Sequence, residues 1–444
     1  MKEAREVYLV DYVRTPFSLS NPLEPDTDVF SKKWGTELAT HVLIDMFDNR
    51  IPNSGSTLKR ENVSEVLTGS ALLQHEHGTF GGRINIWMAK FPFHVPATVF
   101  DKQDCSGMAT LQVGFGNIST GYSDVVVSLG FDQFTRVPLH TYGGKVKVFG
   151  WPPDRLMLNT ESEWYNDDLY DWETSRLLFQ SAQKLAEEEA DNITKDETDK
   201  FSARSHNLAA KAREIGYFKE EIMPIKGHKS GDPENEMVIE EDQFIKNAIT
   251  LEDITQMPSI STPGWAGGYK NPHYSKDAYV AKFGTEEGII TAGNSAPLCD
   301  GASLCLLASK DAVEEYKLNP MSKVVSIGFA AVDPTIRGRA LVPAIQMALE
   351  HANLEVNDID FWEINESFGV VVLNAVKKLG IDWENKLNIH GGAIAIGNPV
   401  SASGLRITSS LARILKEKKV KYGLAAISCG GGQGTAVVIE NLNI

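Results

Sequence analysis

Residues 388–399 read Asn-Ile-His-Gly-Gly-Ala-Ile-Ala-Ile-Gly-Asn-Pro. A run this rich in glycine loses much conformational freedom on folding, so it is expected where backbone must approach another group closely. A second run, residues 428–434, reads Ser-Cys-Gly-Gly-Gly-Gln-Gly. It contains neither G-x-G-x-x-G nor G-K-[ST], which excludes a dinucleotide or P-loop pattern. The two runs predict closely packed loops of an active site.

One structural unit occurs twice in the chain. Ser106-Gly107-Met108 opens an amphipathic stretch that ends near Gly121 and precedes the apolar segment 124–130, while Ser403-Gly404-Leu405 opens a similar stretch before the apolar segment 423–428. Near-continuous apolar strands that alternate with helical patterns are typical of sheets covered on both faces. The repeat predicts a pseudo-twofold α/β fold in which the N-termini of both helices point at a shared centre.

Composition limits the possible functions. The chain has 444 residues, 42% of them hydrophobic and 23% charged, which is ordinary for a soluble globular protein. The formal charge of −16 argues against binding of nucleic acid. The four cysteines form no close C-x-x-C pair. No apolar stretch reaches the ~20 residues that a membrane helix needs, and the N-terminus has no apolar signal region. A cytoplasmic protein without membrane contact is expected.

Separated segments of the sequence share the motifs of one enzyme family. They are Arg14-Thr15-Pro16-Phe17, residues 95–107 (Val-Pro-Ala-Thr-Val-Phe-Asp-Lys-Gln-Asp-Cys-Ser-Gly), Asn365-Glu366-Ser367-Phe368 and the two glycine-rich runs. Together they resemble the thiolases, which make or cleave β-ketoacyl-CoA, and the resemblance runs nearly from end to end.

The resemblance implies a duplicated five-layer αβαβα fold with an inserted loop domain. It divides the chain into an N-terminal half at residues 1–136, a loop domain at 137–284 that covers CoA and substrate, a return to the N-terminal half at 285–312, and a C-terminal half at 320–444.

Three positions depart from the family pattern. Thiolases usually read V-N-x-x-C-x-S-G around the nucleophilic cysteine. When this pattern is aligned without gaps to residues 100–107, Asp104 falls in the alignment column of that cysteine, and Cys105 is the next residue. The family's G-G-A-x-A-x-G-H-P run puts Asn398 in the column of the catalytic histidine. The turn that meets the pantetheine arm of CoA reads Asn294-Ser295-Ala296 instead of N-[AS]-[ST].

Other catalytic columns are intact. By the resemblance, Asn365 orients a water in one oxyanion hole, Cys429 moves the α-proton, and the backbone N–H of Gly431 belongs to the other hole. Such groups stabilise an enolate or a thioester oxyanion. The absent groups are those that form an acyl-enzyme, which requires a thiolate activated by a nearby base.

Each altered position also has a structural alternative. Asp104 stands just before a helix, where an Asp often caps the N-terminus, and Asn398 suits a loop conformation. In the related ketoacyl synthases an asparagine in the place of Asn398 donates to the thioester carbonyl. Cys105 could be activated by the helix dipole, but a shift of one residue turns a helical side chain by about 100°.

A general base is also available in the segment His75-Glu76-His77, inside the loop 69–83 that borders the active site of thiolases. The alternative is a pair of solvated loop histidines, and no third ligand at a recognisable spacing indicates a metal site. His390 is expected to be structural.

A CoA-binding segment is predicted in the loop domain. The helical stretch 194–215 and residues 217–222 match the segment that covers CoA in thiolases, so we expect His206, Ser295 and Ala296 to contact CoA. CoA would be a substrate or product carrier, and no further cofactor or metal is implied. Trp151, Trp164 and Trp172 precede this helix and serve either a different acyl pocket or packing.

Three functions are consistent with these residues. The first is carbon–carbon bond formation or cleavage next to a thioester or ketone without an acyl-cysteine, with Asp104, His75 or His77 activating water or a hydroxyl. The second is an ordinary 3-ketoacyl-CoA thiolase or acetyl-CoA acetyltransferase that uses Cys105. The third is a non-catalytic CoA-binding subunit of a larger complex. The apolar edge segment 95–100 predicts a homodimer or homotetramer.

Overall fold

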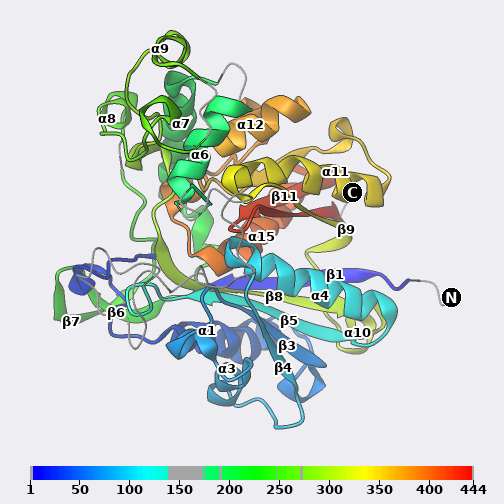
Figure 1. The fold of residues 1–444 in the computed structure, drawn as a ribbon. Coiled ribbons are helices and arrows are strands. Elements are labelled where there is room, and N and C mark those ends of the chain that lie inside the picture. Colours follow the sequence, from blue (N-terminus) through cyan, green and yellow to red (C-terminus); the bar gives the residue numbers. More distant parts are fainter. Residues whose placement is uncertain are drawn as a thin grey trace, which may run out of the picture.

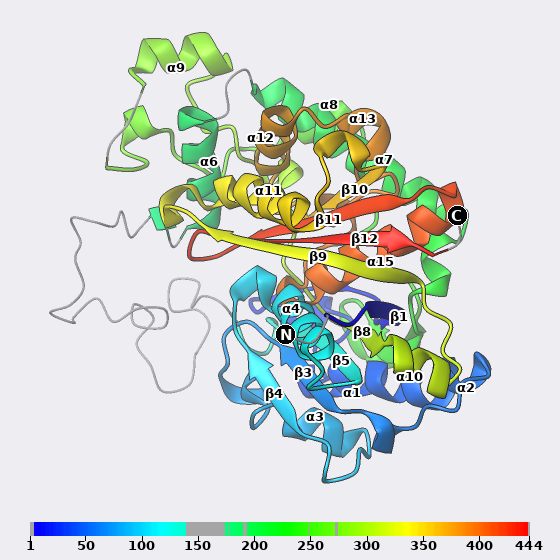
Figure 2. The same ribbon diagram turned by 90° about the vertical axis from the view of Figure 1, so that its right-hand side faces the viewer.

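The computed structural model describes residues 4–138, 174–175, 177–189, 193–247, 249–270 and 274–442. Its layers run helix, sheet, helix, sheet, helix (Figure 1), and the view turned by 90° shows the same order (Figure 2). The central layer consists of α4 (Ser106–Thr120) and α15 (Val400–Lys418). The outer layers contain α11 (Leu341–Ala352) and α12 (Gly369–Leu379) on one side, and α1 (Gly35–Asp45) and α10 (Lys310–Glu315) on the other. The predicted α/β layering is confirmed.

Each half contributes one sheet. The strands of the N-terminal half follow the order β4-β3-β5-β8-β1, and those of the C-terminal half the order β10-β11-β12-β9. The two sheets are joined where β1 and β9 pair over three residues, from Val7 with Val324 to Leu9 with Ser322. The strands are β1 (Val7–Arg14), β3 (Glu65–Gly69), β4 (Ala97–Phe100), β5 (Val125–Asp132), β8 (Cys299–Ser309), β9 (Ser322–Ala331), β10 (Phe361–Ile364), β11 (Tyr422–Cys429) and β12 (Gln433–Asn441), with β2 (Ser18–Leu19) beside β8.

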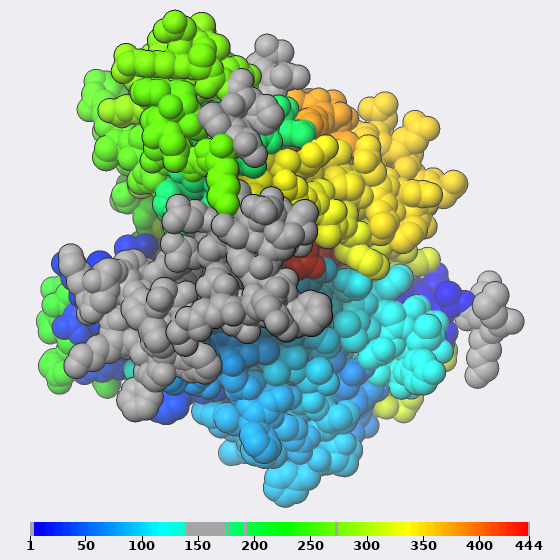
Figure 3. Space-filling view, in the orientation of Figure 1, coloured from blue at the N-terminus to red at the C-terminus, as the bar shows by residue number. Residues whose placement is uncertain are grey.

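The two sheets repeat one topology. β3 and β5 pair in parallel, as do β10 and β11, and antiparallel pairs β5–β8 and β8–β1 correspond to β11–β12 and β12–β9. In the described residues the counterpart of β4 is reduced to a parallel bridge between Trp362 and Leu387. The duplicated unit read from the sequence therefore exists. In the space-filling view the N-terminal half (blue and cyan) lies below the C-terminal half (yellow and orange) (Figure 3).

Glycines allow the two central helices to meet at their N-termini. A Cβ atom on Gly107 would lie 2.3 Å from the carbonyl oxygen of Ser401, and one on Gly404 would lie 2.7 Å from the side chain of Met108. The sequence predicted that the second helix begins at Ser403, but it begins at Val400. Pro399 precedes it with φ −71°, a value that proline fixes and that suits a helix start.

The strands beside the central helices are buried on both faces. Every residue of β5 and of β8 is buried. This explains their near-continuous apolar sequences, because a strand between two helical layers has no solvated face.

The inserted segment is more varied than the predicted helices and loops. The predicted helix 194–215 appears as α7 (Lys195–Glu214), capped by the Thr194 side chain, which accepts from the Glu197 N–H. A hairpin that was not predicted, β6 (Ile225–Lys229) and β7 (Asp232–Ile239), turns at Gly231 with φ +77°. Trp151, Trp164 and Trp172 lie outside the described residues. The other α-helices in the described part of the insertion are α6 (Leu178–Glu188), α8 (Leu251–Thr255) and α9 (Lys276–Phe283).

Short helices also occur along the described chain. They include α2 (Ile51–Asn53), α3 (Arg83–Met88), α13 (Trp383–Lys386) and α14 (Ala393–Ile396), the single-turn helices η4 (His75–Gly78), η5 (Gln103–Cys105), η7 (Tyr217–Glu220) and η9 (Ala292–Asn294), and the longer, kinked segment η10 (Pro334–Ala340).

Candidate active site

Four predicted residues meet at the N-termini of the central helices. Asp104 lies on η5 just before α4, Asn398 precedes α15, Asn365 follows β10, and Cys429 ends β11. All four are buried. The Nδ2 of Asn398 lies 3.4 Å from Asp104 Oδ1, and the Nδ2 of Asn365 lies 3.4 Å from Asn398 Oδ1. The columns that differ from the thiolase pattern are thus neighbours in space.

The orientation of Asn398 is fixed by a residue that the sequence reasoning did not assign to the site. The hydroxyl of Ser403 donates to Asn398 Oδ1 at 2.6 Å, so the amide nitrogen of Asn398 is directed at Asp104. Asn365 Nδ2 also donates to Ser367 Oγ at 3.2 Å, while Asn365 Oδ1 is buried without a partner among the described residues. A buried amide oxygen of this kind is a suitable acceptor for an ordered water.

Asp104 does not serve as the cap of α4. The residue at the N-cap position is Cys105, and the hydrogen bond of the Asp104 carboxylate is with Asn398. The second carboxylate oxygen lies 3.8 Å from Nη1 of Arg337. A buried carboxylate thus stands in the nucleophile column between an amide and a guanidinium group.

Arg337 was missed by the sequence reasoning. It belongs to η10, and its side chain is 4% exposed beside that of Asp104 at 6%. The segment is held against the glycine-rich turn, since a Cβ atom on Gly432 would lie 2.3 Å from the Val332 carbonyl and one on Gly434 would lie 2.6 Å from the Ala340 carbonyl. These glycines bring Arg337 to the site.

The thiols of Cys105 and Cys429 are in contact with each other. The thiol of Cys105 also donates to the backbone carbonyl of Ile427 at 3.5 Å, and both cysteines belong to the same apolar cluster. Burial raises the pKa of the Cys429 thiol well above its ordinary value, and contact with Cys105 and the charge of Asp104 raise it further. Cys429 is therefore a protonated thiol at neutral pH, suited to proton donation rather than to nucleophilic attack.

Gly431 lies in the turn between β11 and β12 with φ +74°, a conformation that favours glycine. The turn is next to η5, because a Cβ atom on the preceding Gly430 would lie 3.1 Å from the Gln103 side chain. The turn therefore lies beside the segment that carries Asp104, which is consistent with the role that the resemblance implies for the Gly431 N–H.

The two histidines occupy different environments. His77 is buried, its Nδ1 lies 3.0 Å from the Ala71 carbonyl, and its Nε2 accepts from the Gln133 N–H at 2.9 Å. Burial lowers the pKa of His77 to about 4. With both ring nitrogens bonded to backbone, this geometry favours a structural role for His77 over general base catalysis. His75 is exposed at the start of η4.

The predicted CoA-side residues lie on segments attached to the Asn365 loop. The N–H of Ala296 donates to the Ser367 carbonyl at 3.1 Å, and Ser295 Oγ donates to the Thr291 carbonyl at 2.7 Å. His206 lies on α7, where burial lowers its pKa to about 4 and its Nδ1 lacks a partner among the described residues. The neighbouring Ser205 donates to Glu366 at 2.6 Å, which ties α7 to the same loop.

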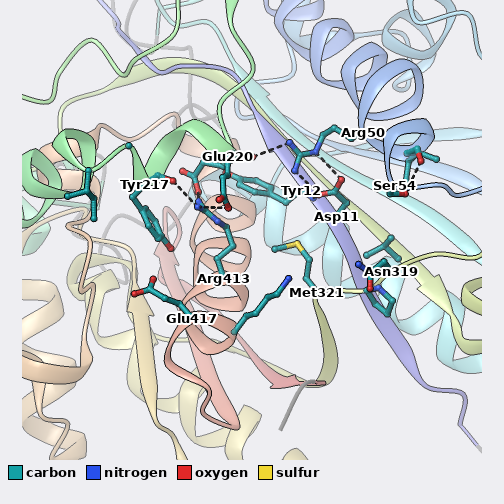
Figure 4. A pocket seen from close by; sticks show the side chains of 17 residues that line it. Asp11, Tyr12, Arg50, Ser54, Tyr217, Glu220, Asn319, Met321, Arg413 and Glu417 are labelled. Carbon is teal, nitrogen blue, oxygen red and sulfur yellow. Dashed lines mark hydrogen bonds and ion pairs between the residues drawn. The ribbon is translucent and has the colours of Figure 1, made fainter.

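A cavity of about 940 Å³ lies elsewhere, at the C-terminal end of α15 (Figure 4). Arg413 at its wall donates to Glu221 at 2.8 Å and to the Tyr217 carbonyl at 2.8 Å. Arg50 donates to both carboxylate oxygens of Asp11 at 2.8 and 2.9 Å. Tyr217, Glu220 and Glu221 of the predicted CoA-covering segment line this cavity, but none of the four motif residues described above does. The cavity is therefore separate from the catalytic site that the motifs predict.

Two further observations concern ligands and membranes. Within the residues that the structure describes, no group of three or more His, Cys, Asp or Glu side chains is arranged to hold a metal ion. None of the helices in the described part of the chain is long and apolar enough to cross a membrane.

Comparison with known proteins defines the class of the chain. Residues 7–266 match the family described as "Thiolase, N-terminal domain", and residues 318–441 match "Thiolase, C-terminal domain". The chain belongs to the thiolase family, as the motifs indicated.

Individual relatives cover almost the whole chain. It is 32% identical to a 3-ketoacyl-CoA thiolase of Marinobacter nauticus over 99% of both chains, and 31% identical to a mitochondrial acetyl-CoA acetyltransferase of Rattus norvegicus over 87% of this chain and 82% of that protein. Among solved structures, human mitochondrial 3-ketoacyl-CoA thiolase in complex with CoA superimposes with a TM-score of 0.77 at 26% identity, covering 98% of each chain. Bacillus anthracis acetyl-CoA acetyltransferase gives a TM-score of 0.78 at 27% identity over the full length of both chains.

Proposed function

We propose that this thiolase-family enzyme binds an acyl-CoA thioester and makes or cleaves a carbon–carbon bond next to a thioester or ketone without an acyl-cysteine intermediate. One observation carries the proposal. Asp104, in the nucleophile column, faces Asn398 and Arg337, whereas the sulfur of Cys105 faces the Ile427 carbonyl. A carboxylate is a poor nucleophile toward a thioester but an effective general base.

The residues suggest a sequence of steps for cleavage of a 3-ketoacyl-CoA by water. Asp104 takes a proton from water, and the hydroxide adds to the keto carbon. The carbon–carbon bond then breaks, the electron pair passes to the α-carbon as a thioester enolate, and the thiol of Cys429 protonates that carbon. Proton return from Asp104 to Cys429 through solvent restores both groups. Aldol-type addition would use the same base and the same enolate stabilisation.

Oxyanion stabilisation would come from the intact columns. Asn365, through a water, supplies an amide on one side, and the N–H of Gly431 supplies a donor on the other. The altered position Asn398 adds a second amide beside Asn365. Donors fixed before the reaction stabilise developing charge without reorganisation, which is the largest single contribution in many enzymes.

CoA binding is proposed through His206, Ser295 and Ala296, and is supported by the CoA complex of a similar solved structure. CoA would be a substrate or product carrier, with no other cofactor. A cytoplasmic location stays a prediction, because relatives include mitochondrial proteins.

Assembly as a homodimer or homotetramer is proposed through the edge of the N-terminal sheet. β4 is the outermost strand, and Phe80, Trp87 and Phe93, on segments that lead to it, are 75%, 42% and 85% exposed. An unpaired edge beside apolar side chains is prone to association. Light scattering should give at least a dimer at micromolar concentration, and a monomer would contradict this assembly.

Isotope incorporation tests the proposed reaction. A panel of 3-ketoacyl-CoA substrates is incubated in water enriched in oxygen-18, without added CoA. Cleavage by water would release a free acid that carries one heavy oxygen in addition to a shorter acyl-CoA. Cleavage that requires added CoA, with no heavy oxygen in the products, would indicate the ordinary thiolase. Absence of turnover, together with CoA binding, would favour the non-catalytic subunit.

A further inference from the structure

Arg337 is a buried cation in the site with an unsatisfied donor. Its Nη1 is shielded from solvent and has no hydrogen-bond partner among the described residues, since the closest charged atom, Asp104 Oδ2, is 3.8 Å away. Arg14, which is equally buried, donates to the carboxylates of Asp242 and Glu221 at 2.6 to 2.8 Å. A buried donor without a partner is costly, so its presence beside a reacting group indicates a ligand that completes it.

Another arginine with unpartnered nitrogens does not lead to the same conclusion. Arg406, inside α15, interacts electrostatically with the buried carboxyls of Glu363 and Glu366, whose pKa values it lowers against the effect of burial. Its countercharges are part of the protein core, whereas Arg337 shares its only described ion pair with Asp104, the proposed base.

The direction of the site determines which part of a substrate would reach Arg337. The CoA-side segment is attached to the two asparagines, through the bond from Ala296 to Ser367 and a bridge between Leu298 and Asn398. Arg337 is attached to the other side, where its N–H donates to the Ser181 hydroxyl on α6 at 3.2 Å. Asp104 lies between the two sides, since its Oδ1 faces Asn398 and its Oδ2 faces Arg337. A thioester that enters from the asparagine side would thus extend its acyl group past Asp104 toward Arg337.

We infer that Arg337 binds a carboxylate on the acyl group, and that the substrates are short CoA thioesters of dicarboxylic or keto-dicarboxylic acids. This inference rests on the proposed acyl-CoA function. A guanidinium group forms two parallel hydrogen bonds with a carboxylate, and such charge-assisted pairs are both strong and selective. Arg337 would be a specificity-determining residue, because an acyl chain that ends in a methyl group would leave its donor unsatisfied.

Calorimetric titration with matched probes tests this inference. Succinyl-CoA and butyryl-CoA have the same chain length and differ in a terminal carboxylate against a methyl group, and CoA alone reports binding of the carrier. The wild-type enzyme should bind succinyl-CoA about 10-fold more tightly than butyryl-CoA or better. Arg337→Met should abolish this preference and leave the affinity for CoA unchanged.

Arg339→Met is the matched control. Arg339 lies on the same segment, is 48% exposed and pairs with Glu189 at 3.1 Å, so its replacement should keep the preference. If Arg337→Met does not fold, Arg337→Lys, which retains the charge without the two-pronged geometry, should lose most of the preference. Equal wild-type affinities for the two thioesters, or a preference that survives in the Arg337 variants, would overturn the inference. Absence of CoA binding to the wild-type enzyme would instead contradict the proposed function.

Discussion

The buried polar groups at the two ends of helix α15 differ in how closely they approach their partners. At the C-terminal end, Arg413 donates to Glu221 at 2.8 Å and lines the cavity of Figure 4. At the N-terminal end, about 20 Å from Arg413 at 1.5 Å per residue, the partners of Asp104 lie at 3.4 and 3.8 Å. Buried polar groups normally find close partners within the protein. The tightly paired end therefore holds the fold together, and the loosely paired end is prepared for a ligand.

The largest expected effect is that of Asp104→Asn. This change keeps the size of the side chain and removes the carboxylate that the proposal uses as a base. The value of kcat should fall on the order of 10³-fold, within the range for loss of a general base. Activity equal to that of the wild-type enzyme would show that Asp104 is structural.

The two cysteines should differ in importance. Cys429→Ala removes the proposed proton donor and should lower kcat on the order of 10²-fold. Cys105→Ala, the same substitution in the neighbouring cysteine, should retain most of the activity because none of the proposed steps uses its thiol, which donates to the Ile427 carbonyl. The comparison by steady-state kinetics fails if Cys105→Ala is the more damaging change.

At the other end of α15 the expected effect is on stability. Arg413→Met leaves the buried Glu221 with Arg14 as its remaining charged partner and should cost about 3 kcal/mol of unfolding free energy, measured in urea, without changing kcat. Burial opposes ionisation of Glu221, but Arg14 and Arg413 lower its pKa below the ordinary value. Its stabilisation is therefore present above the pKa of an unfolded Glu and lost as pH falls through the lowered pKa.

The same variant makes a prediction about acid unfolding. Loss of Arg413 raises the pKa of Glu221, so acid unfolding followed by circular dichroism should begin at a higher pH than in the wild-type protein. An unchanged acid transition would mean that Arg14 alone keeps Glu221 ionised.

The smallest effect is expected from Ser403→Ala. It removes the hydroxyl that donates to Asn398 and should reduce kcat by about 2- to 10-fold, the usual value of one neutral hydrogen bond. Ser401→Ala is the matched control, since Ser401 is two residues earlier on the same helix and the described contacts include no hydrogen bond between its hydroxyl and Asn398. Equal losses in the two variants would indicate a general effect on the helix instead of orientation of Asn398.

The sequence predicted the fold from features that are local. An apolar strand such as 124–130 can be recognised from its own residues, because a strand covered on both faces has no polar positions. The paired Ser-Gly helix starts can likewise be recognised locally. The residues Asp104, Asn365, Asn398 and Cys429 could be chosen because each falls in a motif column. The hairpin β6–β7 was not predicted, since its charged, exposed residues lack a clear alternation.

Arg337 and Ser403 were missed for a different reason. Neither belongs to a motif, and their roles arise from contacts with residues that are distant in the sequence or on the next turn of a helix. Contact of η10 with the glycine-rich turn, which brings Arg337 to Asp104, depends on tertiary packing. His77 was a candidate base from its sequence alone, but only the fold reveals that backbone groups occupy both of its ring nitrogens.

The most direct test of the central claim is a search for an acyl-enzyme. The protein is incubated with acetyl-CoA, acetoacetyl-CoA and succinyl-CoA, quenched in acid and examined by intact-mass and peptide mass spectrometry. The account predicts no acyl adduct on Cys105 with any of these thioesters, while the enzyme still binds CoA. An acyl group trapped on Cys105, together with thiolysis that Cys105→Ala abolishes, would contradict it and establish an ordinary thiolase mechanism.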